Sequence, residues 1–200
     1  MPRKNREIRS AGATSAGPRF VLRIIGGEWR GRKVSFPPVA ASRPTPDRVR
    51  ETVFNWLQPV VPGSRCLDLF AGSGALGLEA LSRGAARVVF VEVDPVAARQ
   101  LSDTLRLLEC DRGQVLRSDA RRYLEGEVEP FDVIFLDPPY AERLLADTCR
   151  RIDARGWLKP GGYVYLEDAA AAGPPELPAG WTLHRSKRAG EVGYHLARRE

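Results

Sequence analysis

Residues 67–77, Leu-Asp-Leu-Phe-Ala-Gly-Ser-Gly-Ala-Leu-Gly, are the stretch that decides the fold. An apolar run that passes through a glycine-rich turn into a helical pattern is typical of a strand, a turn and the start of a helix. Gly72 and Gly74 allow the backbone to approach a ligand closely, and Gly77 permits close packing of the helix on the strand. The stretch therefore predicts a ligand-binding turn at the carboxyl end of a buried strand.

Strand and helix patterns alternate from residue 65 to residue 167. We expect strands at 65–70, 87–92, 114–118, 131–136 and 161–167, and helices at 75–83, 95–108, 120–125 and 142–154. This order predicts an α/β, Rossmann-like fold with a mostly parallel sheet and helices on both faces. Two later segments, 181–186 and 192–198, are expected to form an antiparallel hairpin at the sheet edge, which completes a central seven-stranded sheet.

Acidic residues end the second and third of these strands. Glu92 lies 18 residues after Gly74, where a carboxylate can accept both hydroxyls of a ribose. Asp119, followed by Ala120, is a candidate acceptor for an adenine amino group. Because Gly72-x-Gly74-x-x-Gly77 with a distal acid also matches a dinucleotide site, NAD remains an alternative at this point.

Asp137-Pro138-Pro139-Tyr140 follows the fourth apolar strand and indicates a substrate site. Two prolines cannot continue a sheet ladder, so the chain leaves the sheet here with a carboxylate, backbone carbonyls and a ring. Open α/β sheets bind their ligands at this edge. The carboxylate of Asp137 and the carbonyl of Pro138 can accept hydrogen bonds from an exocyclic NH2 group while Tyr140 stacks on the base. These three residues are the candidate catalytic residues.

Three features favour S-adenosylmethionine over NAD. Asp68 would repel a pyrophosphate but suits the amino group of a methionine moiety, the sequence offers no hydride-transfer partner, and the Asp137 motif faces the same crevice. The candidate cofactor-binding residues are Asp68, Phe70, Ala71, Gly72, Ser73, Gly74, Glu92, Val93, Asp119, Ala120 and Asp137.

Composition excludes several other classes of protein. With 43% hydrophobic and 28% charged residues in 200, the chain is globular. No apolar run is long enough to span a membrane, and the basic N-terminus lacks the apolar core of an export signal, so we expect a cytoplasmic protein. Three widely spaced cysteines and two histidines argue against a disulfide framework and against a metal site.

Basic residues are concentrated in the first quarter of the chain. Residues 1–50 hold 12 Lys/Arg and 3 Asp/Glu, whereas the remainder holds 19 and 22, which favours a nucleic-acid partner. We expect a flexible basic arm at 1–19, a basic β-hairpin at 20–41 and the catalytic domain at 42–200. The hairpin would pair 20–25 with 28–36 across Gly26-Gly27. Trp29 would either stack on a base or anchor the packing of the hairpin.

A helix is expected after Thr45-Pro46, a pair that suits the N-cap and the first helical position. Its apolar stripe consists of Val49, Val53, Trp56 and Leu57. Arg43, Arg48 and Arg50 are left to the polar side, where they could contact RNA.

Together, Asp68-Leu-Phe-Ala-Gly-Ser-Gly, Phe90-Val-Glu-Val-Asp and Asp137-Pro-Pro-Tyr resemble a class I S-adenosylmethionine-dependent methyltransferase acting on an exocyclic amine. Residues 43–55, Arg-Pro-Thr-Pro-Asp-Arg-Val-Arg-Glu-Thr-Val-Phe-Asn, with Ile25-Gly26-Gly27 before them, resemble the ribosomal small-subunit methyltransferase D family. That resemblance implies methylation of N2 of one guanine in 16S rRNA of the small ribosomal subunit. The candidate RNA-contacting residues are Arg30, Arg32, Lys33, Arg43, Thr45, Arg48, Arg50 and Tyr140.

Rival functions remain open beside this one. A DNA adenine-N6 methyltransferase uses the same Asp-Pro-Pro-Tyr chemistry, although 200 residues leave no room for a separate target-recognition domain. A small-molecule methyltransferase is disfavoured by the basic N-terminal quarter. A non-catalytic RNA-binding assembly factor would retain the fold without the reaction. We expect a monomer, since the fold requires no partner chain.

Overall fold

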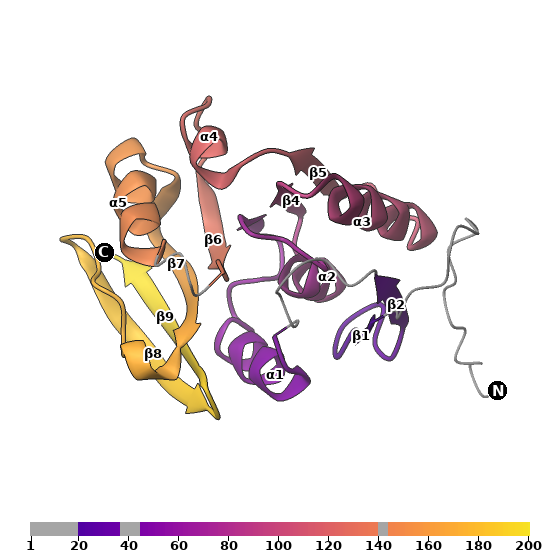
Figure 1. Cartoon of the computed structure of the whole chain (residues 1–200), viewed down its shortest axis with the longest axis horizontal. Helices are drawn as coiled ribbons and strands as arrows, with labels where there is room; N and C mark the ends of the chain where they lie inside the picture. Colours follow the sequence, from indigo (N-terminus) through magenta and orange to yellow (C-terminus); the bar gives the residue numbers. More distant parts are fainter. Residues whose placement is uncertain (1–19, 37–44, 140–143) are drawn as a thin grey trace.

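A seven-stranded sheet lies at the centre of the structure, a computed structural model that describes residues 20–36, 45–139 and 144–200 (Figure 1). The strand order across the sheet is β5-β4-β3-β6-β7-β9-β8. The strands are β3 (Arg65–Asp68), β4 (Arg87–Glu92), β5 (Gly113–Arg117), β6 (Phe131–Leu136), β7 (Leu158–Ala169), β8 (Trp181–Ala189) and β9 (Val192–Arg199).

The sheet is mostly parallel, as the alternating pattern predicts. β5, β4, β3, β6 and β7 pair in parallel, and β9 pairs antiparallel with both β7 and β8. The C-terminal hairpin therefore folds back so that β9 lies inside the sheet and β8 forms its edge. The carboxyl ends of β3, β4 and β6 meet at one edge, where ligands bind in this class of fold.

Helices cover both faces of the sheet, as predicted. They are α1 (Asp47–Trp56), α2 (Ala75–Ser82), α3 (Pro95–Leu107), α4 (Ala120–Leu124) and α5 (Leu145–Arg155). Alternate residues of each strand point to opposite faces, so Cys66 packs in the core with α1, α2 and α3, whereas Leu67 packs with α4 and α5. Asp94 caps α3 by accepting from the N–H groups of Val96 and Ala97, both at 2.8 Å.

The N-terminal hairpin pairs β1 (Phe20–Arg23) with β2 (Lys33–Phe36). The prediction of a second strand from residue 28 is wrong for its first half, because residues 28–31 form turns. These turns dock on α2: the Trp29 N–H donates to the Ser82 hydroxyl at 2.9 Å. At Gly27, which has a φ of 73°, a Cβ would lie 1.8 Å from the Ser82 carbonyl oxygen. Trp29 is buried, so it is a packing anchor of the hairpin and not a base-stacking residue.

Glu79 of α2 fastens the hairpin to the sheet layer. Its two carboxylate oxygens accept from the N–H groups of Ile25 and Gly26, each at 2.8 Å. The same carboxylate pairs with Arg83 at 2.7 Å and lies 3.6 Å from the guanidinium of Arg50. Glu79 and Arg50 are both fully buried, so the hairpin, α1 and α2 share one buried charged cluster.

The start of α1 differs from the prediction. Pro46, not Thr45, occupies the N-cap position, and no side chain caps the helix. The hydroxyl of Thr45 is directed instead toward two carboxylates at the edge of the sheet. Residues 1–19, Arg43 and Tyr140, to which the sequence assigned an arm, an RNA contact and a base-stacking role, lie outside the described residues.

No helix within the described residues combines the length and the apolar character needed to cross a membrane.

Candidate active site

The glycine-rich turn after β3 is held by two acidic side chains. Asp68, the last residue of β3, accepts from the N–H of Gly77 at 2.9 Å. Glu92, the last residue of β4, accepts from the N–H of Gly72 at 2.6 Å and from that of Asp94 at 2.8 Å. Each carboxylate oxygen has more than one lone pair, so Glu92 can shape the turn and still accept a ligand hydroxyl.

Gly77 has the packing role that its position predicts. A Cβ at Gly77 would lie 2.1 Å from the ring of Phe90 in β4. Only glycine therefore allows α2 to approach the sheet closely enough to place the turn at the ends of β3 and β4.

One recess at this edge brings Asp137, a candidate catalytic residue, together with five other predicted cofactor-binding residues. It is lined by Thr45, Asp68, Phe70, Ala71, Gly72, Ser73, Ala75, Leu76 and Asp137. Asp137 comes from the end of β6, next to β3 in the sheet, so residues nearly seventy positions apart along the chain share one site. Gly74 belongs to the same turn, and Glu92, at the end of β4, contacts this turn through the N–H of Gly72. Val93 follows Glu92 in the chain.

The recess is strongly acidic. Burial, with a smaller contribution from the charge of Glu92, raises the pKa of Asp68 to about 7, although the Gly77 N–H acts in the opposite direction. Burial also raises the pKa of Asp137 well above its usual value, with added repulsion from Glu167 and Asp68. Clustered carboxylates with raised pKa values favour a ligand that brings positive charge.

Asp119 lies at the third strand end but has a structural role of its own. Its Oδ1 accepts from the N–H groups of Arg121 at 2.9 Å and Arg122 at 3.1 Å, which caps α4. Its carboxylate remains exposed beside the buried Ala120. The adenine contact predicted for it therefore stays a prediction.

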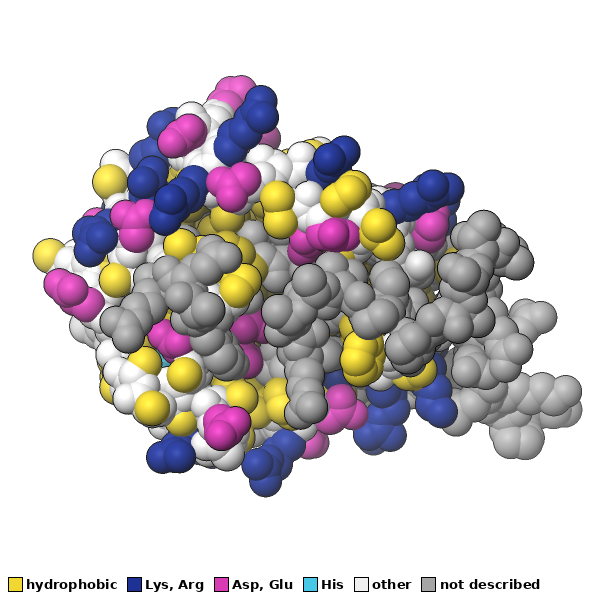
Figure 2. Space-filling model, in the orientation of Figure 1, with side chains coloured by type: hydrophobic (Ala, Val, Ile, Leu, Met, Phe, Trp, Pro, Cys, Tyr) yellow, Lys and Arg dark blue, Asp and Glu magenta, His cyan; other side chains and the backbone are white. Residues whose placement is uncertain are grey.

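The predicted RNA-contacting residues fall into two groups. Arg30, Arg32, Lys33 and Arg48 lie at the surface, and none of them pairs with a carboxylate of a described residue. Figure 2 shows basic side chains along the lower rim of the molecule, below the hairpin and below β8 and β9. These four residues remain candidates for phosphate contact.

Arg50 and Thr45 do not fit the prediction of an RNA contact. Arg50 is fully buried, and its guanidinium donates to the carbonyls of Thr45 and Arg23 and to the Asp47 carboxylate. Thr45 is also buried, with its hydroxyl 3.3 Å from Asp137 Oδ2. Arg50 is therefore a structural residue, and Thr45 belongs to the acidic recess.

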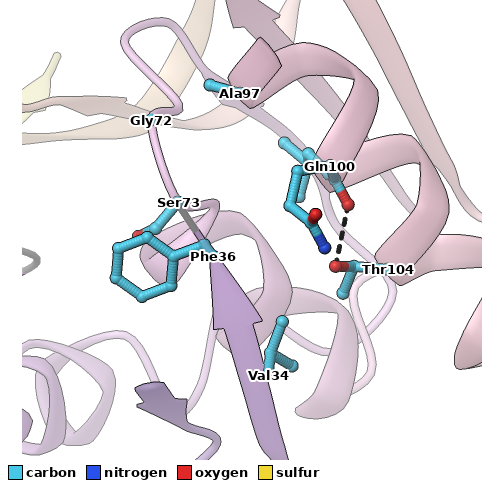
Figure 3. Close-up of a pocket in the computed structure, with 8 residues that line it drawn as sticks. Val34, Phe36, Gly72, Ser73, Ala97, Gln100 and Thr104 are labelled. Atoms are coloured by element: carbon cyan, nitrogen blue, oxygen red, sulfur yellow. Dashed lines mark hydrogen bonds between the residues drawn. The ribbon is translucent and has the colours of Figure 1, made fainter. Parts of the chain in front are cut away.

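A second recess flanks the glycine-rich turn on the side of the hairpin. It is lined by Val34, Phe36, Gly72, Ser73, Ala97, Gln100, Leu101 and Thr104. Figure 3 shows Phe36, at the end of β2, beside Ser73 of the turn. The hairpin thus supports the turn as well as carrying basic residues.

Glu167 of β7 adjoins this recess through Thr45, and Tyr165 hydrogen-bonds Glu167; the sequence-based predictions named neither residue. Glu167 is buried and lies 3.1 Å from the Thr45 hydroxyl. The usable signal was an acid at the end of an apolar strand, the same signal that marked Asp68, Glu92 and Asp137.

Comparisons with known proteins agree with this geometry. The family model described as conserved hypothetical protein 95 matches residues 22–198. The ribosomal RNA small subunit methyltransferase D of Escherichia coli is 47% identical over 179 residues, which cover 90% of this chain and 90% of the relative. The chain belongs to the ribosomal RNA small subunit methyltransferase D family. The Haemophilus influenzae member is 43% identical and covers 88% of this chain and 92% of its own.

Solved structures confirm the fold of this family member. An Escherichia coli protein that is 46% identical superposes with a TM-score of 0.84, covering 90% of this chain and 99% of its own. A 16S rRNA methyltransferase of Thermus thermophilus, 24% identical, has a TM-score of 0.65 over 92% of this chain and 50% of its own. The Rossmann-like class I methyltransferase fold is thereby confirmed, and the dinucleotide alternative is set aside.

Cys66, Cys110 and Cys149 are free thiols. Within the described part of the chain, no cluster of His, Cys, Asp and Glu side chains is arranged to hold a metal ion.

Proposed function

We propose that this protein transfers a methyl group from S-adenosylmethionine to the exocyclic N2 amine of a guanine in 16S rRNA of the small ribosomal subunit. The observation that carries the proposal is that Asp137 of the Asp-Pro-Pro-Tyr motif lines the same recess as Asp68 and the glycine-rich turn. A group that can hold an amine therefore lies beside a cofactor turn. The names of the relatives support ribosomal RNA as the substrate class.

The acidic recess fits S-adenosylmethionine and opposes a pyrophosphate. Buried Asp68 would hold the ammonium group of the methionine moiety, since an ion pair relieves the cost of its burial. Glu92 would accept the ribose hydroxyls. The adenine would lie near Val93, which is 64% exposed, and near Ala120 and Asp119. When bound, this cofactor supplies an electrophilic methyl group on a positively charged sulfonium.

Asp137 and Pro138 would prepare the amine for attack. The lone pair of an exocyclic guanine amine is delocalised into the ring, so the amine is a poor nucleophile. Hydrogen bonds from the amine to the Asp137 carboxylate and the Pro138 carbonyl localise the lone pair and orient it. Asp137 then accepts the proton that the amine loses. Tyr140 is our candidate for stacking on the target base, which must leave its own stack to reach the recess.

Arg30, Arg32, Lys33 and Arg43 are our candidates for RNA contact, together with Arg48 at the start of α1. Phosphate contacts by such residues would make RNA binding fall steeply with salt concentration.

Replacing Lys33 by alanine tests this assignment. We expect weaker RNA binding, a slope of log affinity against log salt that is smaller by about 1, and an unchanged kcat. The control is Arg106→Ala, because Arg106 is also exposed but pairs with Asp103 on α3. Equal salt slopes in the two variants and the wild-type protein would remove Lys33 from the RNA interface.

The raised pKa of Asp68 predicts pH-dependent cofactor binding. Because burial raises the pKa of this carboxyl to about 7 and an ammonium partner favours its ionised form, binding below that pH should release a proton. Affinity should therefore rise about tenfold per pH unit below pH 7 and level off above it.

Calorimetry in buffers of different ionisation enthalpy measures the released protons directly. We expect Asp68→Asn to weaken binding and to lose this pH dependence. Asp137→Ala should keep it, which separates Asp68 from the other carboxyl that lines the recess. An affinity of the wild-type protein that stays constant across this pH range would contradict the assignment.

The function itself is tested by methyl transfer from labelled S-adenosylmethionine to small-subunit rRNA, offered naked and as assembled subunits that lack the modification. Label on N2 of one guanine supports the proposal, and the preferred form identifies the substrate. Label on DNA adenine instead would support the adenine-N6 rival. Cofactor binding without any transfer would support the non-catalytic assembly factor.

A further inference from the structure

A buried hydrogen-bonded chain connects Asp137 to the neighbouring strand β7. β6 and β7 pair in parallel with Leu136 opposite Leu166, so the next residues, Asp137 and Glu167, emerge side by side at the same edge. Thr45 Oγ1 lies 3.3 Å from Asp137 Oδ2 and 3.1 Å from Glu167 Oε2. The hydroxyl of Tyr165 donates to the same Glu167 oxygen at 2.6 Å.

The Thr45 hydroxyl cannot serve both carboxylates at once. A hydroxyl has one hydrogen to donate and two lone pairs with which to accept. When Asp137 is protonated, it can donate to Thr45, and Thr45 donates onward to Glu167. When Asp137 is ionised, the Thr45 hydroxyl can rotate and donate to it instead. The direction of this one hydroxyl therefore follows the charge of Asp137.

We propose that Glu167, acting through Thr45, sets the charge and the orientation of Asp137 and is a positioning residue of the methyl-transfer reaction. This inference rests on the proposed function, in which Asp137 accepts the proton of the amine. Glu167 lies on the side of Asp137 that Thr45 occupies. Because Thr45 contacts Asp137 Oδ2, this arrangement leaves Oδ1 of Asp137 for the substrate.

The charged and titratable groups around Asp137 determine the sign of the effect. Asp68 on β3 and Glu167 on β7 repel its ionised form, and both raise its pKa in addition to burial, whereas the hydroxyl of Thr45 lowers it. The hydroxyl of Tyr165 hydrogen-bonds Glu167, and Tyr194 of β9 lies opposite Glu167 in the strand pairing. On α1, the Arg50 Nε donates to the Thr45 carbonyl at 3.2 Å. A carboxylate with a raised pKa is a stronger proton acceptor near neutral pH.

Two variants should change the pH profile in opposite directions. Glu167→Gln removes a like charge next to Asp137, so the acidic limb of kcat should move to lower pH by about one unit. Since Asp137 becomes a weaker base, kcat at the plateau should fall several-fold, while the KM values for cofactor and RNA stay unchanged. Thr45→Val removes the hydrogen bond that stabilises ionised Asp137, so its acidic limb should move to higher pH.

Matched variants separate this role from structural damage. Thr45→Ser keeps the hydroxyl, so the acidic limb of its kcat profile should stay at the wild-type pH. Tyr165→Phe keeps the ring but removes one hydrogen-bond donor to Glu167. If Glu167→Gln or Thr45→Val fails to fold, the remaining variant still tests the inference, because each has its own predicted direction of shift. If the acidic limb of kcat stays at the wild-type pH in folded Glu167→Gln and Thr45→Val, the inference is overturned. If wild-type protein methylates no rRNA, the proposed function fails instead, which is a distinguishable result.

Discussion

Replacing Asp137 by alanine is expected to lower kcat for methyl transfer by about a thousandfold, the range typical of losing a positioned proton acceptor. Binding of S-adenosylmethionine should survive, because Asp68, Glu92 and the glycine-rich turn remain in place. The fold should survive as well, since burial and two neighbouring carboxylates already raise the pKa of Asp137. Single-turnover transfer and calorimetry measure the two effects separately.

The asparagine variant at the same position divides the role of Asp137 into two parts. The introduced amide keeps a carbonyl oxygen that can accept a hydrogen bond from the amine, but it cannot take up the proton at neutral pH. Activity of Asp137→Asn close to that of Asp137→Ala would mean that proton acceptance dominates. Near-wild-type turnover of Asp137→Ala, with Asp103→Ala on α3 as the control, would contradict the mechanism.

Replacing Glu79 by glutamine is expected to lower the free energy of unfolding by about 3–5 kcal/mol, as when one partner of a buried ion pair is removed. The amide cannot accept from both Ile25 and Gly26, so one part-buried N–H loses its partner. Arg50, which is fully buried, loses the charge that lies 3.6 Å from its guanidinium. The hairpin should separate from α2 before the sheet unfolds.

Urea unfolding measures the total loss, and hydrogen exchange at residues 20–36 tests the predicted order of opening. The matched control is Glu125→Gln, because Glu125 pairs with Arg151 at 3.9 Å on the exposed surface. Such a pair contributes at most about 1 kcal/mol. Equal stability of the two variants would show that Glu79 does not hold the hairpin.

The amino-acid sequence by itself determined the layered architecture and the edge at which the site lies. Alternating apolar strands and helices dictate a parallel sheet covered on both faces. The glycine-rich turn after Asp68, and the acids Glu92 and Asp137 at strand ends, then meet at one edge because parallel strands end together. These signals are local, because each depends on residues that are close in sequence and on the regular spacing of apolar residues.

Tertiary structure alone decided which polar residues are buried and what they contact. The stripe of Val49 and Val53 left Arg50 on the polar side of α1, but the hairpin covers that side and Glu79 supplies the compensating charge. Thr45 likewise could have capped the helix, yet its hydroxyl joins Asp137 to Glu167. The spacing of apolar residues identifies one buried face of a helix, but it does not show which other element packs on the opposite face. A buried charge or hydroxyl is stable only beside partners that come from distant parts of the chain.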